Sequence, residues 1–394
     1  TQGVSSAASD VYKRQSLNDS EEEGKDTAEY VRSMYENLWM SFLAGLTPPF
    51  KEYDDGDTAK LLLLGIKLSI HLACVLGIDY ARTSFVRALV QFTSINNQED
   101  MKEKNVEAIL TVLDIAIADQ NSLKSSWRFV FIVISQVERL KLLSRGIDSG
   151  AVPDLLNARL ANRESLDTTQ SQNSATANGS ANASGANNGA SSGFFSFGKQ
   201  PSISEQAFQK HTNQKMSVET AMLLNSTQID VAIDQVFAKS AKINGDAIFD
   251  FLAGLSEVAK EEIDSSGESK EPRMFSLQKL VDVCYYNMGR IRVQWSALWV
   301  VLNETFSEFG CHSNPAVCFF AIDSLRQMAE RFFDIEELAH FKFQKDFLQP
   351  FNYVITHNSN LKVRDMVLDC VQYLVAKKAA SIRSGWSSLL GVLT

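Results

Sequence analysis

The chain has 394 residues, of which 45% are hydrophobic and 22% charged, with a formal charge of −9 and only 7 prolines. This length allows two or three domains or one extended array, and the few prolines leave long stretches free to form helices. The net acidity argues against bulk nucleic-acid binding, which needs a strongly basic surface. The odd number and wide spacing of the cysteines favour reduced core thiols in the cytosol over a disulfide framework: Cys74, Cys284, Cys311, Cys318 and Cys370.

The first expected feature along the chain is a leader, residues 1–25, which we expect to be foreign to the fold or disordered. Residues 1–15 lack the apolar core of a signal peptide. The apolar run 61–78 is long enough to raise the question of a membrane span. Lys67 and His71 lie inside it, and its flanks lack aromatic and basic anchors. We therefore expect a buried central helix of a helical array, with membrane contact as the alternative.

The composition then divides the rest of the chain into two helical blocks, 26–160 and 217–394, joined by a linker, 161–216. The linker is rich in Ser, Asn, Ala and Gly, so it buries too little apolar surface to offset the entropy of ordering. The C-terminal block ends directly after an apolar stretch, which is typical of a truncated fragment. Three aromatic residues stand out in the polar linker and predict either a docking or membrane-insertion motif or a tether that packs on the adjacent block: Phe194, Phe195 and Phe197.

Within the C-terminal block, the sequence repeats itself. The pattern of residues 291–302, Ile-Arg-x-x-Trp-Ser, returns 91 positions later in residues 382–393. Half of that spacing is also present, since three residues recur 46 positions later: Asn314, Val317 and Asp323 return as Asn360, Val363 and Asp369. A unit of roughly 40 to 47 residues made of paired helices is typical of armadillo and HEAT repeats.

The repeats therefore predict an all-α fold, an armadillo/HEAT-like α-solenoid of stacked helix pairs. Apolar residues at steps of three or four support helices in both blocks. At equivalent places in the repeated pattern, four residues are expected in the core of the repeats: Trp295, Leu298, Trp386 and Leu389.

Residues that carry chemistry are sparse. Cys311, His312 and Cys318 form the nearest approach to a metal cluster, but a fourth ligand and a Cys-x-x-Cys spacing are missing. No phosphate-binding loop, dinucleotide fingerprint or nucleophile elbow occurs. Acidic clusters such as Glu336 and Glu337 are expected on a solvated surface. We expect no catalytic residue, no metal and no cofactor.

The basic residues near the expected helix starts allow two interpretations. One is a ladder of Arg–Asp pairs between repeats, in which Arg290, Arg292 and Arg383 would pair with Asp323 and Asp369. The other is a basic rim on the concave face that receives an acidic partner or anionic lipid. The residues predicted to form this partner-binding rim are Arg290, Arg292, Lys342, Lys345 and Arg383.

Several long motifs resemble one known family. The strings RMFSLQKLVDVCYYNMGRIRVQWSALWVVL (273–302), FAIDSLRQMAERFF (320–333) and VRDMVLDCV (363–371) are similar to the region downstream of the catalytic domain in the large brefeldin-A-inhibited, Sec-seven-type Arf guanine-nucleotide exchange factors. LLLLGIKLSIHLACVLGIDYARTSFVRALVQFT (61–93) resembles the segment that joins the exchange domain to these repeats. The resemblance covers most of 26–394.

The resemblance implies a regulatory role. No segment like the exchange motif of the catalytic domain occurs, so no catalytic residue is carried over. The expected partners are an Arf-type small GTPase and the Golgi membrane surface, the expected location is the cytoplasmic side of Golgi or trans-Golgi membranes, and no nucleic acid is expected. Homodimerisation through the parent protein is left open. The alternative is a general trafficking adaptor or transport-receptor solenoid unrelated to nucleotide exchange.

Overall fold

The computed structural model describes residues 2–96, 101–147, 152, 154–155, 218–267, 269–290, 292–337 and 342–393. Of residues 2–26, 218 and 292–293 it describes the backbone alone. The expected linker, 161–216, lies outside the described residues, and so do the side chains of the expected leader. These two assignments therefore stay predictions.

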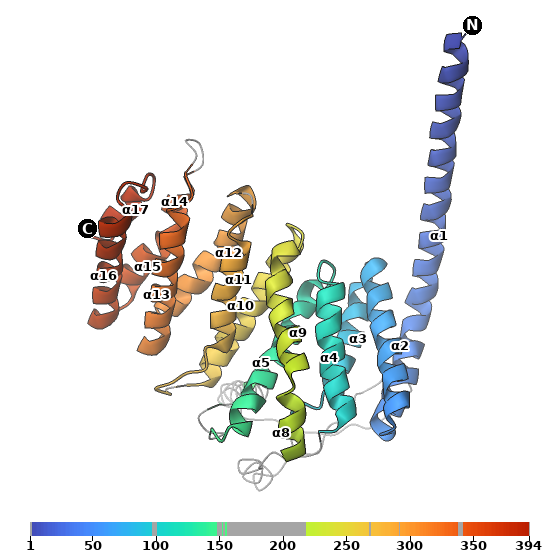
Figure 1. Ribbon diagram of the computed structural model, residues 1–394, viewed down its shortest axis with the longest axis horizontal. Coiled ribbons are helices and arrows are strands. Elements are labelled where there is room, and N and C mark those ends of the chain that lie inside the picture. The colour runs from blue at the N-terminus through green and yellow to red at the C-terminus, as the bar shows by residue number, and fades with distance from the viewer. Residues whose placement is uncertain are drawn as a thin grey trace, which may run out of the picture.

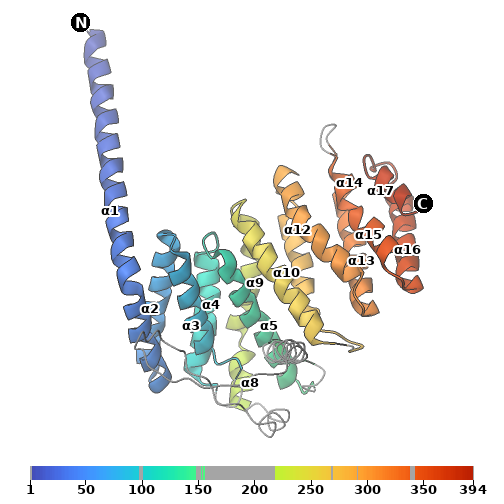
Figure 2. The same cartoon turned by 180° about the vertical axis from the view of Figure 1, so that it is seen from behind.

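Every regular element in the described residues is a helix, which confirms the all-α solenoid. The helices stand side by side in a row that runs from α1 to α17 (Figures 1 and 2). Contacts between elements divide them into two layers. The first layer holds α2 (Gly56–Val75), α4 (Glu103–Ala118), α9 (Thr227–Ala238), α11 (Phe275–Asn287), α13 (Pro315–Phe332) and α16 (Leu361–Lys378). The second holds α3 (Asp79–Phe92), α5 (Trp127–Ser144), α10 (Ala247–Ser265), α12 (Arg292–Gly310), α15 (Gln349–His357) and α17 (Trp386–Gly391).

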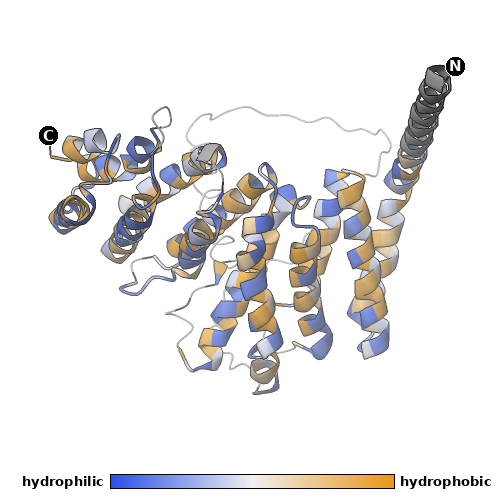
Figure 3. Ribbon diagram, turned by 45° about the horizontal axis from the view of Figure 1, so that its top comes forward, coloured by the Kyte–Doolittle hydropathy of each residue, from blue (hydrophilic) through white to orange (hydrophobic). Residues whose placement is uncertain are grey.

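The remaining elements are one long helix and several short ones. The long helix α1 (Gln2–Glu52) contacts both α2 and α3 through its last turns. The short elements connect the layers or extend them: α8 (Val218–Leu224), α14 (Phe343–Phe347) and the 3₁₀ helices η1 (Lys124–Ser126) and η3 (Lys239–Lys242). Hydrophobic and hydrophilic residues alternate along the helices (Figure 3), as expected where each helix buries one stripe against its neighbours.

The apolar run 61–78 forms most of α2, which begins where Asp55 accepts a hydrogen bond from the Thr58 amide at 2.9 Å. The prediction of a buried central helix is wrong in one respect, because α2 lies near the N-terminal end of the row and buries only one face. Its other face exposes apolar residues, among them Leu61 at 68% and Leu68 at 58%. Among the described helices, α2 alone is long and apolar enough to cross a membrane.

The spacing of 46 residues found in the sequence corresponds to one step of the solenoid. Asn314 and Asn360 cap the N-termini of α13 and α16, each by accepting a hydrogen bond from the backbone amide two residues later. Val317 and Val363, three residues further on, are both fully buried. Equivalent residues therefore occupy equivalent places, because each helix pair buries its stripe against the next pair.

The two helical blocks pack directly on each other through α5 and α10, which precede and follow the expected linker. Buried in this contact, Glu262 of α10 accepts hydrogen bonds from the hydroxyl groups of Ser135 and Ser276, both at 2.7 Å. Arg273 lies 3.6 Å from the same carboxylate and donates to the Ser135 carbonyl at 2.8 Å. These four residues, here called the Glu262 cluster, join α5, α10 and α11 in a water-excluded position.

Replacing Glu262 with Ala should lower the free energy of unfolding by about 3–5 kcal/mol, because the buried Arg273 guanidinium loses its carboxylate. Chemical denaturation followed by circular dichroism measures this change. Glu257→Ala is the matched control on the same helix, since the Glu257 side chain is 54% exposed and pairs with Arg128. The control should cost about 1 kcal/mol or less. Equal losses of unfolding free energy in both variants would show that the buried Glu262 cluster stabilises the fold no more than an exposed ion pair does.

Candidate partner-binding edge

The turns that lead from a first-layer helix to its second-layer partner lie along one edge of the solenoid, at the top of Figure 1. In the C-terminal half, this turn edge comprises residues 239–246, 287–290, 333–337, 342–348 and 379–385. The predicted rim residues fall on this edge, because each of them lies at or just before the start of a second-layer helix or of α14.

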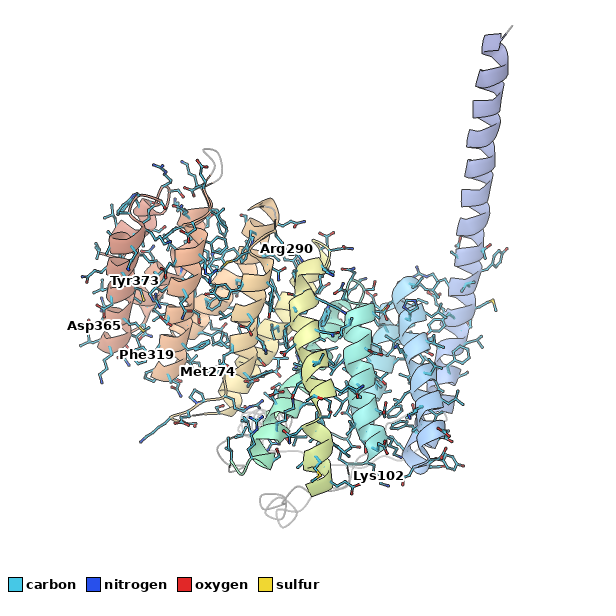
Figure 4. The ribbon with its side chains drawn as sticks, viewed as in Figure 1. Lys102, Met274, Arg290, Phe319, Asp365 and Tyr373 are labelled. Carbon is cyan, nitrogen blue, oxygen red and sulfur yellow. The ribbon has the colours of Figure 1, made fainter. Side chains whose placement is uncertain are left out.

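Arg290 is a structural residue of the turn edge. Its guanidinium donates hydrogen bonds to the backbone carbonyls of Ser240 at 2.9 Å and Ile243 at 2.6 Å, and to the side-chain oxygen of Asn287 at 2.5 Å. In Figure 4, Arg290 lies at the upper edge of the solenoid, near the upper ends of α9 and α12. Partial burial lowers the pKa of the Arg290 guanidinium. Arg290 thus fastens one turn to the turn of the preceding repeat.

The predicted Arg–Asp ladder is wrong for the residues whose side chains are described. Arg290 bonds to carbonyl groups, and Asp323 pairs at 2.7 Å with Arg326 of its own helix. Asp369 is exposed. Other cation–carboxylate pairs do join successive repeats. Arg128 of α5 pairs with Glu261 of α10 at 2.6 Å. Along the first layer the cation of three such pairs is lysine: Lys67–Asp114 at 2.8 Å, Lys279–Asp234 at 3.5 Å and Lys378–Asp334 at 2.5 Å.

Three of the predicted rim residues come together on the surface: Lys342, Lys345 and Arg383, here called the basic trio. All three are exposed, and among the described residues no carboxylate forms an ion pair with them. Lys342 and Lys345 lie at α14, whereas Arg383 precedes α17 in the next repeat. The side chain of the fifth predicted residue, Arg292, lies outside the described ones.

Hydrogen bonds between the two turns hold the basic trio in place. The Gln344 side chain accepts from the Arg383 amide at 2.7 Å, and the Ser384 hydroxyl accepts from the Lys345 amide at 3.2 Å. Glu337 accepts from the amides of Gln344 and Ser384, both at 2.9 Å. The amides of Lys345 and Arg383 are thus paired with the neighbouring turn, while the cationic side chains are exposed.

Sequence reasoning missed the three residues that organise this site, Glu337, Gln344 and Ser384. It placed Glu337 with Glu336 on a solvated surface, which holds for Glu336 alone. A signal was available, because Glu337 and Ser384 are 47 residues apart, one repeat length. Side chains at this separation meet across neighbouring turns.

The predicted core residues lie as follows. Trp295, Leu298 and Leu389 are at most 2% exposed, and the Trp295 indole donates to the Asn287 carbonyl at 2.7 Å. Trp386 is partly buried against the same core. In the described part of the chain, no three His, Cys, Asp or Glu side chains gather as they would around a metal ion.

All five cysteines are free thiols, and only Cys311 is not fully buried. Burial raises the pKa of Cys74 and Cys370 to about 12, so both are protonated at neutral pH.

Comparisons with known proteins agree with the resemblance found in the sequence. A family model described as Mon2/Sec7/BIG1-like, HDS matches residues 331–394, the segment that holds the basic trio. The Arf guanine nucleotide-exchange factor SEC7 of Saccharomyces cerevisiae is 46% identical over 364 residues, 92% of this chain and 17% of that protein. Human brefeldin A-inhibited guanine nucleotide-exchange protein 1 is 36% identical over 368 residues, 92% of this chain and 18% of that protein.

The resemblance to the large Sec7-type Arf exchange factors is confirmed. A third relative, sec71 of Schizosaccharomyces pombe, is 37% identical over 93% of this chain and 19% of its own length. The chain thus spans less than a fifth of each of these three relatives. It is similar to one region of the Sec7-type proteins, and the HDS match covers the end of α13 and the elements from α14 to α17.

Replacing Arg290 with Ala should lower the free energy of unfolding by about 1–3 kcal/mol, because two backbone carbonyls lose their donor. Arg383→Ala, the matched change at an exposed arginine of the same edge, should stay within about 0.5 kcal/mol. Thermal melting of both variants measures the difference. If the Arg290→Ala protein were as stable as the Arg383→Ala protein, the hydrogen bonds of Arg290 would not stabilise the fold, and Arg290 would count as a surface cation.

Proposed function

We propose that the chain is a noncatalytic, regulatory segment of a Golgi Arf guanine-nucleotide exchange factor, which supports membrane recruitment and the response to activated Arf. The observation that carries the proposal is the basic trio, three exposed cations without carboxylate partners in the described residues. They lie in the segment that matches the Sec7-like HDS model. The names of the relatives support the link to Arf.

The trio suits an anionic partner for electrostatic reasons. Each Lys or Arg near an anionic membrane contributes about 1 kcal/mol, an attraction that decays within about 10 Å at 0.1 M salt. Three cations held by hydrogen-bonded turns would contribute about 3 kcal/mol, which is about two orders of magnitude in affinity. An acidic surface of an Arf-type GTPase would be attracted by the same charges. Exchange catalysis would belong to another part of the parent protein.

Reversing the three charges together, Lys342→Glu, Lys345→Glu and Arg383→Glu, should lower binding to anionic vesicles at least about 100-fold. Circular dichroism and the melting temperature should stay nearly unchanged, because the side chains are exposed. The matched control reverses three exposed cations on the opposite edge: Lys270, Lys362 and Arg364. Vesicle flotation at low and high salt measures the effect. Equal losses in both triple variants would show that net charge, and not this edge, determines binding.

The response to Arf needs a separate measurement. Immobilised Arf loaded with GTP should retain the unaltered chain more strongly than Arf loaded with GDP, and the charge reversal on the trio should remove this difference. Equal retention on both nucleotide forms would contradict the proposed response. It would favour the alternative function, a general trafficking adaptor.

A further inference from the structure

An apolar cavity of about 280 Å³ opens at the turn edge beside the basic trio. Ile335, which is 38% exposed, forms part of its mouth. Four aromatic side chains line the cavity: Trp295, Phe332, Phe343 and Phe347. The Trp295 and Phe332 rings meet edge to face at 4.8 Å between centroids. Such walls favour another aromatic ring, which gains both burial and edge-to-face contacts.

The volume indicates how much the cavity holds. An engineered apolar cavity of about 150 Å³ accepts one benzene molecule. The cavity of about 280 Å³ is close to twice that size, so it has room for two phenyl rings. A water-filled apolar pocket of this size is unfavourable, because water finds few hydrogen-bonding partners on aromatic walls.

The chain carries a segment of matching chemistry, Phe-Phe-Ser-Phe at residues 194–197, which lies outside the described residues. Lys199 follows closely, and residues 193–204 contain no Asp or Glu. The charged residues that line the cavity are Arg290, Glu336 and Glu337. Arg290 already bonds to backbone carbonyls and Glu337 to backbone amides, whereas Glu336 is exposed and would not be repelled by a segment without carboxylates. Two adjacent phenyl rings and one nearby cation complement an aromatic cavity with a carboxylate at its entrance.

The length of chain between the segment and the described fold allows the contact. Twenty residues, 198–217, separate Phe197 from the start of α8 at Val218. A chain of this length reaches about 65–70 Å when extended and about 25 Å as a flexible coil. α8 lies at the opposite edge from α14 (Figure 1). Helical chain of about 20 residues spans about 30 Å from one edge to the other, and two steps of about 10 Å lead from α9 to α13. Combined at right angles, these two distances give a separation of about 36 Å, which lies between the two lengths.

We propose that Phe194, Phe195 and Phe197 dock in cis in the cavity between α12, α13 and α14. Two of the rings fill the cavity, Lys199 approaches Glu336, and the linker then crosses the turn edge next to the basic trio. A tether of this kind gives an effective concentration of roughly 1 mM, so a segment with a Kd of about 100 µM is bound about 90% of the time. The inference does not depend on the proposed function.

The test uses a fluorescent peptide of residues 190–203 and the full chain, with fluorescence anisotropy as the readout. The unaltered chain should bind the peptide weakly, because its own segment occupies the cavity. A variant with Phe194, Phe195 and Phe197 all replaced by Ser should bind it about 10-fold more tightly. No peptide binding by this folded variant, or equal binding by both proteins, would overturn the proposal.

Two further variants locate the peptide. In the triple-Ser background, Ile335→Arg at the mouth should abolish peptide binding, whereas Val231→Arg, at another exposed apolar position, on α9, should not. If Val231→Arg alone abolished peptide binding, the segment would dock in the groove between α4 and α9, and the assignment to the cavity between α12, α13 and α14 would be wrong. Phe341→Ser in the unaltered chain should leave peptide binding weak. Tight binding there would show that the cavity holds the neighbouring Phe341 instead.

Discussion

The continuity of the solenoid depends on the packing of α5 against α10. These helices belong to blocks separated by more than 60 residues outside the described fold, yet they share one interior. The buried carboxylate of Glu262 reinforces this constraint, because it is satisfied only when Ser135, Arg273 and Ser276 are all in place. Every later repeat stacks on this contact, so the position of the turn edge follows from it.

A second regularity arises from the same stacking. Side chains repeatedly bond to groups one repeat away, 45 to 48 residues distant: Arg290 to Ile243, Trp299 to Asp346, Asn358 to Gly310 and Asn314 to Ser269. Such bonds satisfy the helix ends, whose backbone groups would otherwise be orphaned. Two of these bonds, from Arg290 and Trp299, hold backbone carbonyls of the turn edge, whereas the cations of the basic trio are exposed. A surface of this kind can exchange charged residues at little cost in stability, which suits a binding edge.

Much of the fold could be predicted because helical periodicity is local. The steps of three or four residues predicted the helices, and the recurrence of Asn314 as Asn360 predicted the repeat, since both cap first-layer helices. The site was harder. The basic residues were predicted as one group near helix starts, and the sequence did not separate the structural Arg290 from the exposed cations. The apolar run 61–78 was assigned to a central position for a similar reason, because hydrophobicity does not reveal how many neighbours a helix has.

The amino-acid sequence by itself determined the helices, the repeat length, the buried stripes and the family resemblance, all of which depend on residues close together or on a regular spacing. Only the tertiary structure decided which cationic side chains are exposed and available to bind a partner. Arg290 and Arg383 precede equivalent helices, but the turn of the preceding repeat presents carbonyl groups to the guanidinium of Arg290, whereas the Arg383 side chain stays exposed. The physical reason is that a polar side chain pairs with whatever the neighbouring repeat places beside it, and that neighbour lies nearly 50 residues away in the chain.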